Sequence, residues 1–422
     1  MRCGSLNELV YVTNKNSHHI QVFSVSGEHN YCLLCPPNVE AVPSVAIGHV
    51  TCYASEVPSS PSSSGRHTKP ILCVCDEWNH RVVSYDVSSL ESHRRNVGRF
   101  ALPGDNISST LQTSRRALHV SLSTLPFHAQ FGGHGSASSD LNHPCSVAVA
   151  DYCDGQRPNQ PCEVFVCDWG NHRVQVLELL CSCHCKSSGA EHSLVLVPVR
   201  RWGCFGDEQG QFRHPTAVAV VAQPSLPVRS LLCGHANELP IEFPASQPRA
   251  SLSPQAHGAA VYICDGGRSL GPARIQQFCG AGCFLRQWNA GASLQTFLDQ
   301  VHPYASHLSA DCFGMVYASV HFHNRSSIEI YSTTGTLLQC IDSLPLVLPP
   351  AVPLDPLHEE NAEAAAPAPG IPDTRLLASS RSMGFRSQDI SSLFPSGIAV
   401  TAEGTLLICD TGRFPHKVSV CR

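Results

Sequence analysis

Residues 74–82 read VCDEWNHRV, and residues 166–174 read VCDWGNHRV. In both stretches an apolar run ends in Cys and Asp, a short polar turn follows, and Arg-Val opens a second apolar run. Strand-forming residues on either side of a turn rich in Asp, Asn or Gly are typical of a β-hairpin. Each stretch therefore predicts two antiparallel strands joined by a tight turn.

The same pattern recurs four more times in looser form. The copies lie at residues 11–23, 262–275, 316–331 and 407–418, and only the copy at 316–331 has Val in place of the Asp or Asn. The residue just before that position is always small: Thr13, Cys75, Cys167, Cys264, Ser319 and Cys409. Free cysteine packs well as a small buried side chain. We expect these residues to lie in the core, because a repeated unit buries its apolar face against its neighbours.

Further short strands flank the hairpins. Apolar segments precede four of them at residues 44–47, 146–149, 217–220 and 397–400, and candidate fourth strands follow at 199–203 and 284–288. Several of the first strands follow a proline: Pro43, Pro144, Pro215 and Pro395. Proline is tolerated at the first residue of a strand, where its missing N–H breaks no ladder bond. Four antiparallel strands per unit, arranged radially, predict an all-β fold: a six-bladed β-propeller of four-stranded blades formed by residues 1–422 as one domain.

The spacing between copies predicts long insertions. From Asp76 to Asp168 is 92 residues (168 − 76) and from Asp168 to Asp265 is 97 (265 − 168), about twice the ~40–50 residues of a typical blade repeat. We expect loops or disorder at residues 55–69, 87–118, 180–195, 222–258 and 342–391. The first copy has no preceding inner strand and the last has no following outer strand. Two explanations stay open: the termini pair to complete one shared blade, or the chain is a truncated product.

Composition favours an intracellular protein without a membrane anchor. Charged residues make up 14% of the chain and the formal net charge is -5, so no overall attraction to nucleic acid or anionic membrane is expected. The N-terminus reads MRCGS, without the apolar core of a secretory signal, and no apolar run reaches the ~20 residues of a membrane helix. We therefore expect a cytoplasmic location and no membrane or DNA partner. The 22 cysteines are unusual for a reducing compartment, and the repeat explains four of them as core residues.

The Asp-to-Arg signatures at residues 76–81 and 168–173 resemble those of the NHL-repeat family. The glycine-rich segment at residues 202–215, WGCFGDEQGQFRHP, and its shorter version at 131–135 followed by His143-Pro144, also resemble that family. The resemblance implies a β-propeller, commonly of six blades. It leaves open several functions found among such propellers, which include protein binding, RNA binding and substrate recognition in ubiquitin-ligase systems.

The hairpin turns hold the candidate binding residues. Asp and Asn close such turns through side-chain-to-backbone hydrogen bonds, and Arg pairs with carboxylates, so a structural role is expected for most of them. Trp78 and Trp169 lie in the turns of successive copies and should therefore share one face, where they could form a protein-binding hot spot or pack over a neighbouring loop. The candidate binding set is Trp78, His80, Arg81, Trp169, His172 and Arg173.

Metal binding and catalysis have weaker support. The segment 181–185, CSCHC, and the pair Cys32 and Cys35 carry metal-ligating residue types, but neither has a second pair at convincing spacing. The resemblance extends to peptidyl-amidating lyases, which would imply metal-binding histidines on strands lining the channel. The positions that follow the prolines are not His: Ser44, Cys145, Thr216, Tyr304 and Ser396. His143, His214 and His302 precede the prolines, and His307 stands alone. We predict no cofactor, no metal and no catalytic residue.

Two binding alternatives remain beside a protein partner. RNA binding would use arginines, which cluster at Arg94, Arg95, Arg99, Arg115, Arg116, Arg200, Arg201 and Arg213. A ubiquitin-ligase role would be limited to substrate recognition, because no RING-like Cys/His array precedes Val10. The sequence favours a noncatalytic propeller that acts as a protein-binding scaffold, with RNA binding as the alternative.

Overall fold

The structure is a computed structural model. It describes residues 2–3, 9–13, 19–24, 29–35, 39, 42, 44–53, 66–88, 118–121, 127–150, 162–183, 192–222, 259–266, 271–291, 302–322, 325–342, 394–401, 404–410 and 417–421. In this part of the chain no helix is long and apolar enough to cross a membrane.

The described strands form six sheets in chain order. The first sheet contains β1 (Arg2–Cys3), β2 (Leu9–Thr13), β3 (His19–Ser24), β4 (His29–Leu34) and β8 (Leu118–Ser121), and the second contains β5 (Val45–Tyr53), β6 (Arg66–Asp76), β7 (Arg81–Asp86) and β9 (Phe127–Phe131). The third contains β10 (Pro144–Ala150), β11 (Cys162–Asp168), β12 (Arg173–Cys183) and β13 (His192–Trp202), and the fourth contains β14 (Ala217–Ala222), β15 (Ala259–Asp265), β16 (Arg274–Cys279) and β17 (Phe284–Asn289). The fifth contains β18 (Tyr304–Ala310), β19 (Val316–Phe322), β20 (Arg325–Tyr331) and β21 (Leu337–Ile341), and the sixth contains β22 (Pro395–Val400), β23 (Leu406–Asp410) and β24 (Lys417–Cys421).

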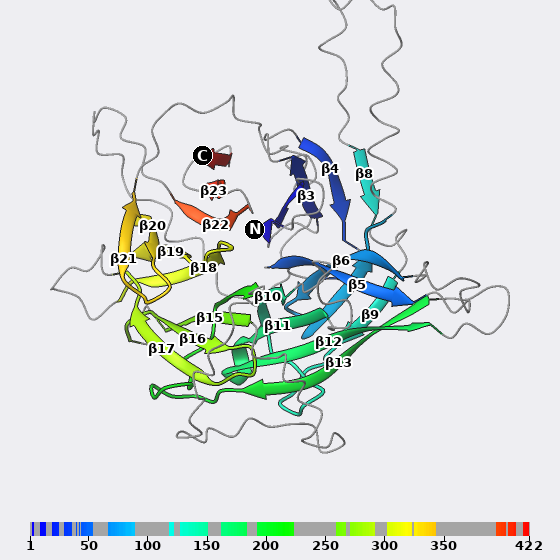
Figure 1. Cartoon of the computed structure of the whole chain (residues 1–422), viewed down its shortest axis with the longest axis horizontal. Helices are drawn as coiled ribbons and strands as arrows, with labels where there is room; N and C mark the ends of the chain where they lie inside the picture. The colour runs from blue at the N-terminus through cyan, green and yellow to red at the C-terminus, as the bar shows by residue number, and fades with distance from the viewer. Residues whose placement is uncertain are drawn as a thin grey trace, which may run out of the picture.

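The prediction of an all-β propeller is confirmed. Every predicted hairpin is an antiparallel pair, for example β6 with β7 and β11 with β12. Figure 1 shows the sheets arranged around a centre, with β5, β10, β18 and β22 toward the middle and β13, β17 and β21 at the rim. Each neighbouring pair of sheets shares a hydrophobic cluster, so the core is divided among the spaces between sheets.

The prediction of six four-stranded blades is wrong in its count. In the described ranges five sheets have four or more strands, and the sheet β22–β24 has three. The first sheet has a fifth strand because β8 returns from the segment after the second sheet's hairpin and pairs in parallel with β4.

Among the described strands, the two ends of the chain do not complete a shared blade. The short strand β1 pairs with β2 and serves as the first strand of its own sheet. The first and sixth sheets meet instead through side chains, where Val10, Val12 and Phe23 pack with Ala399, Leu407 and Cys409. Side-chain burial therefore closes the ring.

Several stretches expected as loops are strand. Residues 66–69 belong to β6, 180–183 to β12, 192–195 to β13, and Leu118 to β8. The hairpin strands simply continue beyond the core, as the pairing of Cys183 with His192 shows. The remaining parts of the predicted insertions, apart from a few residues at their edges, lie outside the described residues.

Five of the six small residues before the turns are buried in the core, as predicted, whereas Thr13 is only partly buried. Cys75, Cys167, Cys264 and Ser319 are almost completely buried. Burial also raises the pKa of the neighbouring thiol Cys73 to about 12, since a thiolate would lose its hydration there. Cys73 therefore fills space as a neutral thiol, which fits the packing role.

Two tryptophans link successive sheets at the rim. Trp202, at the end of β13, lies against Gly282 in the turn between β16 and β17. Trp288 of β17 lies in the same way against Gly335 in the turn between β20 and β21. Both glycines have a positive φ, +94° and +86°. Each indole therefore occupies the space where a side chain of the next sheet's turn would lie.

Candidate functional site: a histidine–aromatic arc

A buried carboxylate organises each well-formed hairpin turn. Asp168 accepts hydrogen bonds from the backbone N–H of Asn142 (2.6 Å), the amide of Asn171 (2.8 Å) and Nε of Arg173 (2.7 Å). Asp76 makes the matching bonds to Asn79 (2.9 Å) and Arg81 (2.7 Å). Burial raises the pKa of Asp168 above its ordinary value, although Arg173 and the other donors oppose this shift. The carboxylate is therefore a structural anchor that is kept in place by its donors.

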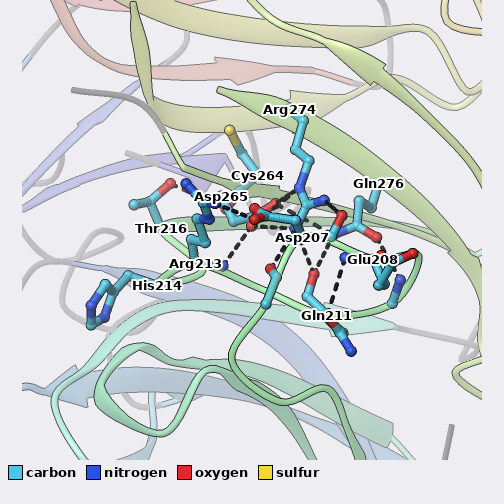
Figure 2. Close-up of polar contacts among 12 residues, drawn as sticks. Asp207, Glu208, Gln211, Arg213, His214, Thr216, Cys264, Asp265, Arg274 and Gln276 are labelled. Atoms are coloured by element: carbon cyan, nitrogen blue, oxygen red, sulfur yellow. Dashed lines mark hydrogen bonds and ion pairs between the residues drawn. The ribbon is translucent and has the colours of Figure 1, made fainter. Parts of the chain in front are cut away.

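The repeat arginine holds the glycine-rich segment that precedes its own sheet. Arg173 donates to the carbonyls of Ser136 (2.8 Å), Ala137 (2.9 Å) and Asp140 (2.7 Å). In the next sheet Arg274 plays the same part: it pairs with Asp265 at 3.1 Å and donates to the carbonyls of Gly206, Asp207 and Gln211 (Figure 2). The guanidinium groups are thus directed toward the backbone of their own loops. Arg81 is less enclosed, and it also donates to Gln130.

The repeat histidine joins one sheet to the next. Nδ1 of His80 accepts the backbone N–H of His143 (3.0 Å), and Nδ1 of His172 accepts that of His214 (3.2 Å). All four histidines have a left-handed backbone, with φ between 52° and 58°, a conformation that non-glycine residues adopt uncommonly. The same unusual geometry at two equivalent positions shows that it is built into the repeat.

These histidines and three further rings form a continuous chain of contacts, the histidine–aromatic arc. The ring centroids of His134 and His80 are 4.4 Å apart, and those of His80 and His143 are 4.5 Å apart. His143 meets the edge of Trp169 at 6.3 Å, and Trp169 stacks on His214 at 4.0 Å. The chain then runs from His214 to His172 (4.2 Å) and from His172 to Phe205 (4.9 Å).

The arc crosses three sheets on a single face. Its members come from the β6–β7 and β11–β12 turns, the latter containing the short 3-10 helix η2 (Trp169–Asn171), and from the segments between β9 and β10 and between β13 and β14. Phe205 is 64% exposed and Trp169 is 37% exposed, and Trp78, in the same turn as His80, is 61% exposed. The face therefore presents large rings to solvent on a support fixed by buried ion pairs.

The sequence identified only part of this site. Trp78, His80, Trp169 and His172 do lie on one face, with Trp169 packed against the segment that carries His214. Phe205, His134, His143 and His214 were not predicted as site residues. A signal was present, because a histidine precedes Pro144 and Pro215 directly after each glycine-rich segment.

Acidification is expected to destabilise the arc. Burial lowers the pKa of His80 below 6.5, and His143 and His134 add to this effect while Asp76 opposes it. Burial and then His214 lower the pKa of His172. Protonation at Nδ1 would also turn an acceptor into a donor that faces an N–H. The stabilising contribution of these neutral rings is full above about pH 6.5 and is lost as the pH falls through the folded pKa values.

The measurement is the free energy of unfolding between about pH 7.5 and pH 5, the range in which imidazoles titrate. The variant His80→Asn/His172→Asn is expected to show a flatter pH dependence than the native chain. Asparagine is the suitable replacement because it tolerates the left-handed backbone better than most residues. Parallel curves for the two proteins would contradict this assignment.

Metal-ligating residue types do not gather in the described part of the chain. Among the described residues no group of three or more His, Cys, Asp or Glu is placed to hold a metal ion. Cys32 and Cys35 are both buried, and of the segment 181–185 only residues 181–183 are described, within β12.

Comparison with known proteins adds little about function. No protein-family model matches the chain, and no curated protein sequence matches it. Among solved structures, one of Kuenenia stuttgartiensis hydrazine synthase is similar over 98% of this chain and 92% of that chain, with 8% sequence identity and a TM-score of 0.39. A likeness of this size assigns no function to the chain.

Proposed function

We propose that this chain is an NHL-type propeller that acts as a binding platform and that its histidine–aromatic arc docks a protein partner. The observation that carries this proposal is the unbroken run of seven rings across three sheets, bordered by the exposed Trp78. Tryptophan and other aromatic residues dominate the energetics of protein interfaces because they bury a large area with few rotatable bonds.

The support beneath the arc suits such a role. The apolar rings of Trp169 and Phe205 lose little hydration on docking, whereas burying unpaired charges is costly. Buried Asp–Arg pairs fix the turns, so little conformational entropy remains to be lost when a partner binds. Around the rings lie exposed acidic residues such as Asp207 and Glu208, which would supply a polar rim.

The RNA alternative has less support. Arg200 is buried and pairs with Glu163 at 2.5 Å, and Arg213 pairs with Asp207. Arg201 donates to the carbonyl of Ser136. These three arginines contact other groups of the ring. The other arginines of the RNA-binding prediction lie outside the described residues.

The proposal also covers the role of the sheet β22–β24 in the ring and the location of the protein in the cell. We infer that the three-stranded sheet β22–β24 is an incomplete blade that completes the ring, because it packs against the fifth sheet on one side and the first on the other. We also infer a cytoplasmic location, to be checked by imaging the tagged full chain in cells.

The binding test compares proximity labelling by the full chain in cells with that of two variants. The variant Trp78→Ala/Phe205→Ala removes the two most exposed rings of the face. The control Phe313→Ala removes a ring that is 78% exposed but precedes β19, at the opposite end of the hairpin strands. We expect a protein neighbour that is retained by the native chain and by the control and lost with the double variant.

The purified neighbour should then bind the double variant at least about 30-fold more weakly, the equivalent of one hot-spot residue of ~2 kcal/mol. Equal affinity for the native chain and the double variant would overturn the proposal. Recovery of RNA cross-linked to this face would favour the RNA alternative.

A further inference from the structure

The fifth sheet departs from the repeat at its hairpin. Where the second, third and fourth sheets pair Asp with Arg across the hairpin, this sheet pairs Val320 with Ser327. The next cross-strand pair is His321 with Ser326, and His321 is only 2% exposed. A buried imidazole therefore takes over the polar role at this turn.

Strand register places Ser306 beside that imidazole. Ser306 is the bulge residue of β18, as Cys145 is of β10 and Ser396 is of β22. From the sequence, Tyr304, which follows Pro303, is predicted to be the residue of this strand equivalent to Cys145 and Ser396. The equivalent residue is Ser306, two positions later, because the bulge of β18 lies further from its proline. Cys145 and Ser396 donate to backbone carbonyls, whereas Ser306 meets a side chain that can accept its proton.

The three side chains form a chain of hydrogen bonds. Oγ of Ser306 lies 2.8 Å from Nε2 of His321, and Nδ1 of His321 lies 2.8 Å from Oγ of Ser326. When Nδ1–H donates to Ser326, Nε2 is left as the acceptor for the Ser306 hydroxyl. Ser319 lies 3.3 Å from Nε2, but its hydroxyl donates to the carbonyl of Pro395. The imidazole is thus oriented toward Ser306.

Aromatic rings surround the imidazole of this hydrogen-bond network. The rings of Tyr304 and Phe394 flank His321, with centroids 5.2 Å and 4.9 Å from the imidazole. Ser306 is only partly buried, in the first strand of its sheet, which lies toward the centre of the ring (Figure 1). A hydroxyl with access, a base within hydrogen-bond reach and a third group that orients the base are the signature of an activated nucleophile.

We propose that Ser306 is a nucleophile toward carboxylic esters with an apolar acyl group, with His321 as its base and Ser326 as a positioning residue. The Ser306 proton passes to Nε2 while Oγ forms a bond to the acyl carbon. The bond from that carbon to the alkoxy oxygen breaks, and the departing alcohol takes the proton from Nε2. Water then attacks the acyl-serine with the same base, which releases the acid and restores Ser306.

Because Ser326, the residue that orients His321, is uncharged, it affects the expected rate of ester hydrolysis. Ser326 fixes the tautomer but stabilises the imidazolium less than a carboxylate would, so slow turnover is expected. The competing explanation is that the hydroxyls only satisfy a buried imidazole. That explanation predicts no nucleophilic reactivity at Ser306, and the two are therefore separable.

The test is covalent labelling of the folded full chain with an alkyl fluorophosphonate, in which Ser306 displaces fluoride at phosphorus. We expect one adduct, mapped to Ser306 by peptide mass spectrometry and absent from Ser306→Ala. His321→Gln should slow labelling by about 10²-fold or more, the usual contribution of a general base. Ser326→Ala should slow it less.

The control is Ser309→Ala, which removes a hydroxyl of the same strand that accepts the N–H of Val400 and should leave labelling unchanged. Should His321→Gln fail to fold, acidification of the native chain provides the second measurement, because protonation of the imidazole must slow labelling. The proposal would be overturned if no adduct formed at Ser306. It would also be overturned if neither His321→Gln nor acidification changed the rate of labelling. The binding test of the arc does not depend on this result, since the fifth sheet contributes no ring to the arc.

Discussion

Replacing Asp168 with alanine is expected to lower the free energy of unfolding by about 3–5 kcal/mol, the usual cost of removing one partner of a buried ion pair. The side chain is fully buried and accepts three hydrogen bonds, one from the backbone of Asn142 and two from Asn171 and Arg173 of its own hairpin. Without it, the guanidinium of Arg173 would remain buried without its carboxylate. The N–H of Asn142 would also lose its acceptor.

The raised pKa of Asp168 shows that burying this carboxylate is itself costly. That cost is recovered when the carboxylate is removed, but the unpaired arginine remains, so the net effect is still a loss. The matched control is Asp207→Asn, which alters the ion pair with Arg213 at a side chain that is 62% exposed. This change should cost no more than about 1 kcal/mol. Denaturant titration measures both, and equal midpoints for the two variants would refute the anchoring role.

Replacing Gly282 with alanine should lower the free energy of unfolding by about 2–5 kcal/mol. A left-handed backbone costs an L-residue roughly 1–2 kcal/mol, and overpacking adds typically about 1–3 kcal/mol. A Cβ at this position would lie 2.7 Å from the indole of Trp202, which is itself buried between Phe165 and Phe278. The indole has little room to move aside.

Gly404→Ala separates these two contributions. Gly404 has a similar φ of +83°, but a Cβ there would meet no atom within 4 Å. This variant should therefore show only the backbone cost. The midpoint temperature of thermal unfolding should be lower for Gly282→Ala than for Gly404→Ala. The reverse order would exclude the contact with Trp202 as an important link between sheets.

Local patterns predicted the hairpins well because each is specified by a few adjacent residues. The turn that contains Asp76 and Arg81 carries its own hydrogen-bond partners within five residues, so its structure follows from its sequence. The ring closure was not predictable in the same way. It depends on a hydrophobic cluster that joins the first and sixth sheets and includes Val12 and Cys409, which no local pattern specifies.

The candidate site was partly predictable for the same reason. Trp169 and His172 lie in a recognisable turn, but their partners His214 and Phe205 come from a segment more than 30 residues away. Which ring meets which depends on the packing of one sheet against the next. The extension of β12 and β13 was missed because polar and cysteine-rich strands resemble loops in composition.

The boundary between the first and sixth sheets would open differently from a blade shared by the two termini, which could open only by breaking strand pairing. Among the described strands these two sheets share no ladder hydrogen bonds, and their meeting surface is made of apolar side chains. Parting them would expose apolar area to water without disrupting a sheet. Among the described residues, the first and sixth sheets can therefore part while both stay intact, at the cost of the apolar area that they bury against each other.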